Sequence, residues 1–256
     1  MDETIIQTGD GFWNLRGSFR IMGVLDVGTH MSLVRRRGGG FVFLDSYTLE
    51  GEMKRRVMEM TANGAKVEAI LNLHPFHTVH VARMHQDFPA AKLYGTRRHV
   101  ERAPDLPWET LRTDSAALHA VFADDLQFSV PRGVDFISTN ENVHFSSVLA
   151  YHPASKTIHA DDTLTYLKAP GLLRLLIPQR LGFHPTLAKA LEKRKGAAAD
   201  FRAWAQELSS GWQQAENLCA AHNHVLRTGS PSLSRQIDAA LDRVAPKLDA
   251  HRKTYG

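Results

Sequence analysis

Hydrophobic and polar positions along the 256-residue chain predict a first block of strands in its N-terminal half. Residues 19–27, 31–37 and 41–45 are rich in β-branched and aromatic side chains, and three glycines at 38–40 separate the last two segments. Because strands favour such side chains and glycine permits a tight connection, the pattern is typical of a β-meander. Residues 67–73 are almost entirely apolar, which predicts a strand covered on both faces.

Two helices are predicted on either side of this last strand. The first is expected to be capped by Thr48 and to stop at Asn63-Gly64, because apolar residues recur between them at helical spacing, at Leu49, Met53, Val57 and Met60. The second is expected from about residue 76 to 87, since Pro75 suits the first turn of a helix. Residues 91–95 then predict another strand, and 101–124 a loop with a short helix.

A second strand-rich block follows and leads into a helical C-terminal part. Alternating and β-branched segments separated by turn residues predict strands at 126–130, 134–139, 147–151 and 157–160. From about Pro170 onward, apolar spacing predicts helices at 172–181, 185–195, 201–209 with the following stretch up to 218, and 230–250. The segment 172–181 follows Asp161-Asp162 closely, so a lid over a substrate pocket is a second interpretation beside a core helix.

The order of these elements indicates the architecture. Two strand-rich blocks, each followed by helices, favour a single domain over residues 1–256 with helices outside two sheets packed face to face. We therefore expect the mixed α/β (α+β) class and a four-layer αββα sandwich. A doubly wound parallel sheet would need shorter strand–helix alternation throughout the chain.

Composition and charge narrow the classes of function. The chain is 43% hydrophobic and 23% charged and has no apolar run of about 18 residues, which excludes a membrane-spanning helix. The N-terminal residues lack the basic-then-apolar pattern of a secretory signal, and a single cysteine, Cys219, cannot form an internal disulfide, so we expect a cytoplasmic protein.

The basic residues do not indicate a nucleic-acid partner. The formal charge is only +4, and the basic residues occur in short scattered groups, at 35–37, 54–56, 97–98 and 193–195. A groove for phosphates needs a continuous basic stripe, so we expect no nucleic-acid binding. We expect a small-molecule partner instead, and a homo-oligomer stays open.

Three regularly spaced histidines are the strongest chemical signal in the chain. His74, His77 and His80 directly follow the apolar segment 67–73. Because neutral imidazole is a common ligand of zinc and similar ions, the triplet is a candidate metal site. In a chain with 14 histidines the spacing can also be accidental, so the rest of the sequence has to decide.

Three later features extend the triplet. His144 precedes a predicted strand, Asp161 and Asp162 end another strand, and His222 and His224 follow a helical segment. In this order the sequence resembles the metallo-β-lactamase-fold superfamily from about residue 10 to 228, and is most similar to a little-characterised branch with an altered metal motif.

The resemblance implies a set of metal ligands. The family's His-x-His-x-Asp-His motif is matched by the stretch 74–80, its next histidine by His144 and its bridging aspartate by Asp162. Its last histidine is matched by His222, with His224 as the alternative. The implied ligands are therefore His74, His77, His80, His144, Asp162 and His222, with Asp162 also catalytic. Asp161 and His224 are expected to contact these ligands.

The motif departs from the family pattern at one carboxylate. When His77 and His80 take the family's second and third histidines, Val79 takes the place of the aspartate and His74 lies one residue from the first histidine. A valine cannot bind a metal. One subsite would then keep His74, His77 and His144, and the other His80, His222 and Asp162, so one ion and two ions both stay open.

The resemblance implies a metal-dependent hydrolase that attacks an ester, lactone, thioester or similar bond with a metal-activated water. Zinc is the expected ion, and iron or manganese are alternatives. Two other functions stay open, a non-catalytic metal-binding protein of the same fold and a nucleic-acid-processing hydrolase. Seven other histidines have no counterpart in the motif and are expected to be structural or on the surface. They are His85, His99, His119, His152, His159, His184 and His251.

Overall fold

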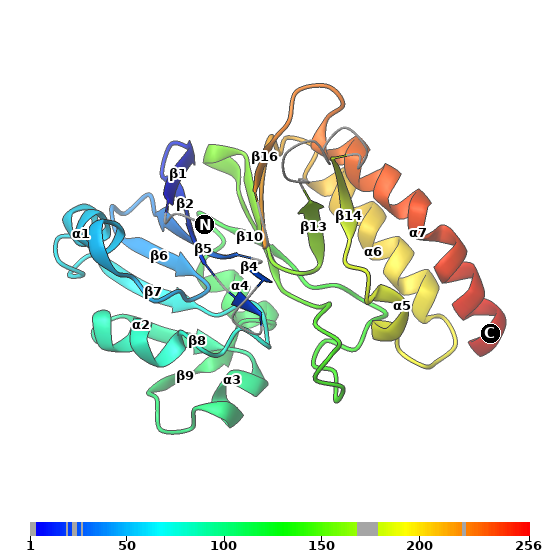
Figure 1. Cartoon of the computed structure of the whole chain (residues 1–256), viewed down its shortest axis with the longest axis horizontal. Coiled ribbons are helices and arrows are strands. Elements are labelled where there is room, and N and C mark those ends of the chain that lie inside the picture. Colours follow the sequence, from blue (N-terminus) through cyan, green and yellow to red (C-terminus); the bar gives the residue numbers. More distant parts are fainter. Residues whose placement is uncertain (1–3, 19, 22–24, 27, 168–178, 222–223) are drawn as a thin grey trace.

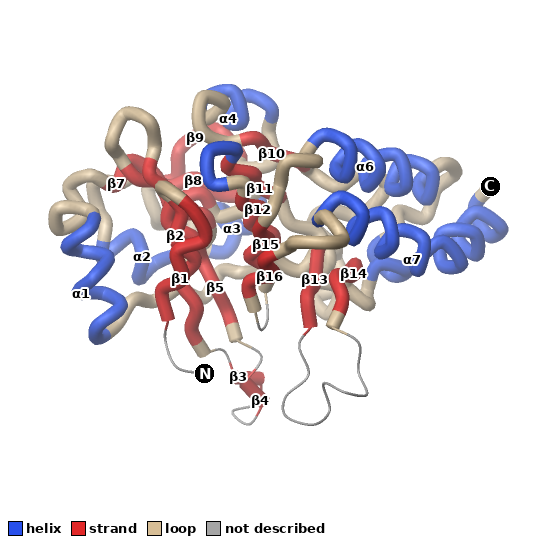
Figure 2. Tube along the Cα trace, turned by 90° about the horizontal axis from the view of Figure 1, so that it is seen from above, coloured by secondary structure: helices blue, strands red, loops and turns tan. Residues whose placement is uncertain are grey.

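Two β-sheets lie face to face, with helices on the outer face of each (Figure 1). The computed structural model describes residues 4–18, 20–21, 25–26, 28–167, 179–221 and 224–256. The view from above shows the same order of layers, with α1 and α2 on one side and α6 and α7 on the other (Figure 2). The predicted mixed α/β class and four-layer αββα arrangement are confirmed.

The first sheet has seven strands in the order β1-β2-β5-β6-β7-β8-β9. Neighbouring strands are antiparallel up to β6 and parallel from β6 to β9. Because parallel neighbours need crossover connections, helices follow β6, β7 and β8. The strand bounds are Thr4–Gly9, Phe12–Gly17, Thr29–Arg35, Phe41–Leu44, Val67–Leu71, Lys92–Gly95 and Trp108–Arg112, and α1, α2 and α3 span Gly51–Met60, Val81–Asp87 and Arg97–Arg102.

The second sheet has five strands in the order β10-β11-β12-β15-β16, and only β12 and β15 are parallel. Their bounds are Gln127–Ser129, Leu149–His152, Thr157–Ala160, Asn217–Ala220 and Val225–Arg227. Helices α5, α6 and α7 span Leu187–Ala190, Ala197–Gly211 and Leu233–Tyr255. Two hairpins, β3–β4 and β13–β14, and two short helices, α4 and η1, complete the described elements, at Arg20–Ile21, Leu25–Asp26, Leu164–Leu167, Arg180–Phe183, Ala116–Val121 and Pro153–Ser155.

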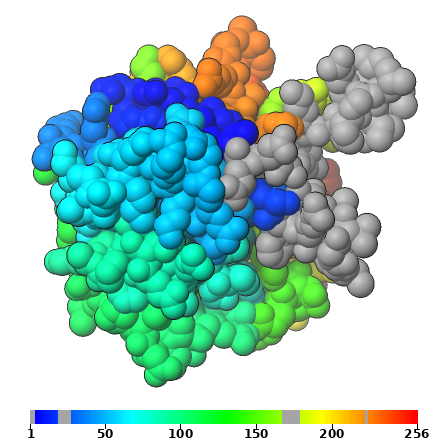
Figure 3. Space-filling view, turned by 60° about the vertical axis from the view of Figure 1, so that its left-hand side comes forward, coloured from blue at the N-terminus to red at the C-terminus, as the bar shows by residue number. Residues whose placement is uncertain are grey.

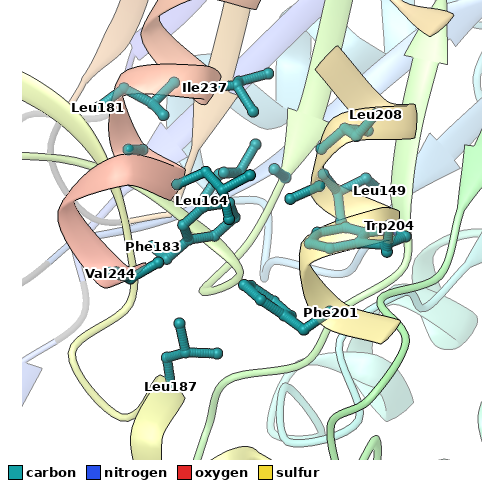
Figure 4. Close-up of a cluster of buried hydrophobic side chains, with 14 of the residues drawn as sticks. Leu149, Leu164, Leu181, Phe183, Leu187, Phe201, Trp204, Leu208, Ile237 and Val244 are labelled. Atoms are coloured by element: carbon teal, nitrogen blue, oxygen red, sulfur yellow. The ribbon is translucent and has the colours of Figure 1, made fainter. Parts of the chain in front are cut away.

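Three buried apolar clusters hold the layers together. One joins the first sheet to α1 and α2, whose outer surface is continuous in Figure 3 (cyan). A second joins the second sheet to α6 and α7 through Phe183, Phe201, Trp204 and other large side chains (Figure 4). The third lies between the two sheets and includes Phe12, Val34 and Leu71. No helix among the described residues combines the length and apolarity needed to cross a membrane.

Several predicted elements differ from the structure. Residues 108–112 form β9 rather than loop, and 217–220 form β15 rather than the end of a helix. Residues 134–139 form no strand; Val134 makes only an isolated bridge with Leu191. Pairing partners distant in sequence decide these cases, and local propensity does not report them.

Two helix starts are also later than predicted. α1 begins at Gly51 with Glu50 at its cap position, and Thr48 instead hydrogen-bonds His80. α2 begins at Val81, so residues 76–80 are turn and not helix. The predicted helix at 172–181 lies largely outside the described residues, and its last two residues belong to β14.

Candidate metal centre

The candidate site lies where three strands of the two sheets end. Asp45 directly follows β6, His74 follows β7, and Asp161 and Asp162 directly follow β12. All four side chains are buried, with at most 3% of the surface of any of these residues exposed. The C-terminal ends of strands from both sheets thus deliver a histidine and three carboxylates to one place.

His74, His77 and Asp162 form the first candidate ligand group. One potential ligand atom of each residue lies within 4.8 Å of those of the other two. His74 Nε2 is 3.2 Å from Asp162 Oδ2, and the rings of His74 and His77 stack with centroids 4.0 Å apart. The His77 side chain is 25% exposed, so it is the member of the group that solvent reaches.

A tight turn presents the two histidines. The His77 N–H donates to the His74 carbonyl at 3.0 Å, and the Phe76 N–H donates to His74 Nδ1 at 3.1 Å. Because α2 begins only after this turn, His77 and His80 do not share a helix face, which corrects the sequence-based expectation.

His80 lies apart from this group in the structure. It occupies the N-cap position of α2, its Nδ1 bonds to Thr48 Oγ1 at 2.8 Å, and Tyr47 packs edge-on against its ring. Burial lowers the pKa of His80, which keeps the ring neutral. No candidate metal group within the described part of the chain contains His80, so its role as a ligand stays a prediction.

His144 lies at the rim of the site. Its ring stacks on Phe76 at 4.5 Å and meets His74 edge-on at 6.4 Å, while its Nε2 bonds to the Glu141 carbonyl. The Arg98 guanidinium lies over the Phe76 ring, 4.3 Å from its centre, and pairs with the Glu141 carboxylate. His144 is thus next to the group without belonging to it.

The last predicted ligand lies outside the described residues. His222 and Asn223 are not described, and His224 is half-buried immediately before β16. The choice between His222 and His224 therefore stays a prediction.

Sequence reasoning missed three residues of the site, His30, Asp45 and His159. Asp45 Oδ1 accepts the backbone N–H groups of Leu73 and His74 at 2.8 and 3.3 Å, and its Oδ2 pairs with His159 Nε2 at 3.1 Å. Asp45 also adopts a positive φ of 63°. The signal available in the sequence was a carboxylate directly after the apolar run 41–44.

A buried hydrogen-bond relay fixes the proton positions next to Asp161. Arg16 donates to Asn14 Oδ1 at 2.9 Å, and Asn14 Nδ2 donates to the Met31 carbonyl at 3.2 Å, so the amide orientation is determined. The same Nδ2 lies 2.9 Å from His30 Nδ1, which must accept. The neutral ring therefore carries its proton on Nε2 and donates it to Asp161 Oδ1 at 3.2 Å.

This relay engages both ring nitrogens of a member of another geometrically suitable metal group. His30, His159 and Asp161 place ligand atoms within 4.8 Å of one another. Burial lowers the pKa of His30 to about 3, with the Asp161 hydrogen bond opposing it, so the ring stays neutral. Because Nδ1 accepts from Asn14 and Nε2 carries the proton, His30 acts here as a hydrogen-bond donor to Asp161.

The charges around His159 are balanced within the cluster. Burial alone would lower the pKa of His159, but the adjacent Asp161 and Asp45 carboxylates raise it to about 9. Burial and the charge of Asp161 raise the pKa of Asp45 to about 7. For Asp161, burial opposes ionisation, but the adjacent His159 and His30 rings hold its pKa well below the usual range. An imidazolium thus lies between two carboxylates.

Val79, which the sequence resemblance aligns with an aspartate of the metal motif, is on the outside of the molecule. Its exposed fraction is 74%, which is higher than that of any other large hydrophobic residue in the described part of the chain. The position that lacks a carboxylate therefore faces solvent.

The residues of the first group fit a zinc-type ion. With bonds of about 2.0–2.2 Å, two donors on a tetrahedral ion lie about 3.4 Å apart, close to the 3.2 Å between His74 Nε2 and Asp162 Oδ2. His74 Nε2 is fully buried and makes no hydrogen bond of good geometry with any described residue. Since Phe76 N–H donates to Nδ1, the neutral ring carries its proton on Nε2. Ligation through Nε2 would require that proton to move to Nδ1 and the Phe76 N–H bond to be released.

Comparison with solved structures identifies similar folds. The DIM-1 metallo-β-lactamase exposed to ceftazidime matches with a TM-score of 0.61 at 15% identity, over 96% of this chain and 99% of the other. A metallo-β-lactamase from Erythrobacter litoralis matches with a TM-score of 0.60 at 14% identity, over 98% and 96%. FIM-1 from Pseudomonas aeruginosa in its mono-zinc form matches with a TM-score of 0.59 at 12% identity, over 96% of each chain.

Comparison at the level of sequence adds no relative, since no protein-family model and no curated protein matches the chain. Identities of 15% and below carry the fold and not the activity. The topology, the two facing sheets and the coverage of nearly the full length agree, so the chain has the metallo-β-lactamase fold.

Proposed function

We propose that the protein is a metal-dependent hydrolase whose ion is bound by His74, His77 and Asp162. The observation that carries the proposal is the convergence of these three ligand atoms within 4.8 Å, with the buried His74 Nε2 3.2 Å from Asp162 Oδ2. Zinc is the expected ion, with iron or manganese as alternatives, because two imidazoles and a carboxylate suit all three. The solved mono-zinc form of FIM-1, a protein of the same fold, supports this choice.

An ion of this kind supplies a hydroxide nucleophile near neutral pH and polarises the oxygen of the bond under attack. The Asp162 carboxylate, almost fully buried beside His74, would orient the nucleophile and accept its proton. The partly exposed His77 marks the side from which a substrate would reach the site. We propose an ester, lactone, thioester or similar small-molecule bond as the substrate class, because the fold permits these reactions.

The remaining predicted ligands are proposed either to complete the shell of this ion or to bind a second one. His144 is proposed to complete the coordination shell, which requires that its Nε2 leave the Glu141 carbonyl. His80 and either His222 or His224 are proposed ligands of a second ion. Each of these assignments is tested by metal content independently of turnover.

The decisive experiment measures bound metal in the purified wild-type protein and in His77→Ala and Asp162→Asn. We expect about one or two ions per wild-type chain and loss of most of the metal in both variants, because each removes one of three ligands. His251→Ala is the matched control, since His251 lies on α7, where its Nε2 bonds the Glu192 carbonyl and its ring packs against Tyr255.

Two outcomes would contradict parts of this proposal. A content of less than about a tenth of an ion per chain after metal supplementation would contradict the proposed metal site. Stoichiometric metal without turnover of ester, lactone, thioester, β-lactam or phosphodiester substrates would favour the non-catalytic metal-binding alternative. The exposed Val79 at the place of a family carboxylate is the feature that keeps this alternative open.

A further inference from the structure

We propose that Asp161 is itself a metal ligand and replaces the carboxylate that the histidine-rich segment lacks at Val79. This inference rests on the proposed metal-dependent function and adds a ligand to it. It assigns to Asp161 a direct bond to the ion rather than a contact with another ligand.

The position of Asp161 is suitable for direct ligation. Its Oδ1 lies 3.6 Å from His77 Nδ1, within the separation of about 4.2 Å that two donors on one ion can have with bonds of about 2.1 Å. Asp161, His77 and Asp45 also form a group whose ligand atoms lie within 4.8 Å of one another. His77 therefore belongs to the group with Asp162 and to a second group with Asp161.

The two oxygens of Asp161 are engaged unequally. Oδ1 accepts from His30 Nε2, whereas Oδ2 is fully buried, makes no hydrogen bond with any described residue, and lies 3.7 Å from His159 Nε2. Oδ2 therefore has only a long ion pair with His159, beyond hydrogen-bond distance, whereas Oδ1 has a hydrogen bond.

Asp45 differs from Asp161 in this respect. Both of its oxygens are engaged, Oδ1 by the N–H groups of Leu73 and His74 and Oδ2 by His159. We therefore assign Asp45 a positioning role: it holds the backbone from which His74 projects and it fixes His159.

The relay from Arg16 gives Asp161 a fixed orientation. Arg16, Asn14 and His30 are all at most 3% exposed, and each hydrogen bond in the series has one determined direction. Partners of this kind orient a ligand, and their removal typically lowers metal affinity by about 10- to 100-fold. His30 is thus a positioning residue for Asp161.

Charge also favours a cation at this place. Asp45, Asp161 and Asp162 are each at most 3% exposed, and buried carboxylates require paired charges or a metal. The His159 ring lies between Asp45 and Asp161, and Asp162 faces His74 on the other side. A divalent cation beside His77 would offset the negative charge that these three carboxylates bring to one buried place.

The test compares the affinity for Zn²⁺, measured by competition with a chromophoric chelator, in wild type, Asp161→Asn and Asp162→Asn. We expect an affinity loss of about 100-fold or more in both variants, since each amide replaces a carboxylate ligand. Asp125→Asn is the matched control, because Asp125 is a buried aspartate that pairs with Arg36 and not with the cluster. The visible spectrum of the Co²⁺-substituted protein should change in Asp161→Asn and stay unchanged in Asp125→Asn.

A second pair of variants covers the case in which Asp161→Asn does not fold. His30→Phe keeps the volume and removes the donor to Asp161, so Zn²⁺ affinity should fall by about 10- to 100-fold. His30→Gln retains an N–H donor and should restore most of the loss.

Wild-type Zn²⁺ affinity and an unchanged Co²⁺ spectrum in Asp161→Asn, with the loss confined to Asp162→Asn, would overturn the assignment of Asp161 alone. If Asp161→Asn does not fold, unchanged affinity in His30→Phe overturns it. Absence of metal from the wild-type protein would instead contradict the proposed function.

Discussion

The space between the two sheets has an apolar end and a polar end, and the same strands build both. Along the inner face of β2 the side chains are Phe12, Asn14 and Arg16, and these pair across to Val34, Ser32 and His30 of β5. Phe12 and Val34 belong to the apolar cluster between the sheets, whereas Arg16 and His30 lie in the hydrogen-bonded relay next to Asp161. The change occurs within four residues of one strand.

The two ends have different physical roles. Apolar burial stabilises the fold by about 25 cal/mol per Å² and is non-directional. Buried hydrogen bonds contribute little net stability, but they are directional and fix positions. We infer that the apolar end supplies stability and that the polar end supplies the geometry of the metal centre.

The largest expected effect is at the apolar end. Leu71→Ala should lower the free energy of unfolding by about 2–5 kcal/mol, because the fully buried Leu71 leaves a cavity between the sheets. Urea denaturation measures the loss, and bound metal per folded chain should not change. Val121→Ala, at a 49% exposed position, should stay within about 0.5 kcal/mol of wild type. A reduced metal content in folded Leu71→Ala would contradict the separation of the two ends.

At the polar end, a bound ion should be the main source of added stability. Zn²⁺ at 100 times its dissociation constant should raise the free energy of unfolding by about 2.7 kcal/mol, because the ion binds only the folded cluster. Thermal unfolding with and without Zn²⁺ measures the increase. His77→Ala should show none of it. An equal increase in His77→Ala would place the ion elsewhere in the protein.

The ionisation of Cys219 tests whether water reaches the apolar end of the space between the sheets. It is fully buried there, and burial raises the pKa of its thiol to about 12, with Arg16 opposing the shift. Because the folded pKa lies above the unfolded value of about 9, the thiol's contribution to stability is complete below pH 9 and is lost as the pH rises toward 12.

The slope of the unfolding free energy against pH should accordingly include about −1.4 kcal/mol per pH unit from this thiol between pH 9 and 12. Denaturation of wild type and Cys219→Ala at pH 8, 9 and 10 isolates this contribution. Parallel slopes in the two proteins would mean that water reaches the thiol.

The smallest expected effect is at the rim of the polar end. Arg98→Ala removes the ion pair with Glu141 and the contact over Phe76, and should cost about 1 kcal/mol or less, because Glu141 is largely exposed. Hydrogen exchange should nevertheless rise in the segment that carries His144, since its stacking partner Phe76 loses support. Arg97→Ala is the control, as Arg97 pairs only with the exposed Glu101. Equal exchange in both variants would show that Arg98 does not order this segment.

The sequence predicted the layers, several strands and part of the site. Strand blocks followed by helices indicated the αββα order. The apolar run 67–73 predicted that His74 follows a buried strand, and in the structure this strand ends at Leu71. Asp162 and His77 were predicted and the structure brings them to His74. The short strands β9 and β15 were missed, since their partners lie in other parts of the chain.

The relay could not be predicted from the sequence for a specific reason. In β2 and β5, polar residues alternate with Leu15, Met31 and Leu33. Such alternation normally indicates a strand with its polar face in solvent. Here both faces are buried, because helices cover one side and the second sheet covers the other. The polar side chains therefore line the buried site between the sheets.

The sequence by itself determined the periodicity of each strand, the chemistry available at each strand end and the absence of a carboxylate at position 79. Only the tertiary structure decided which face of β2 and β5 is turned inward, and that Asp45, Asp161 and Asp162 meet around two histidines. The physical reason is that local propensity acts within a few residues. The contacts of Asp45 and Asp161 with His159, His30 and His77 instead join residues of both sheets, and His30 and Asp161 are 131 positions apart in the sequence.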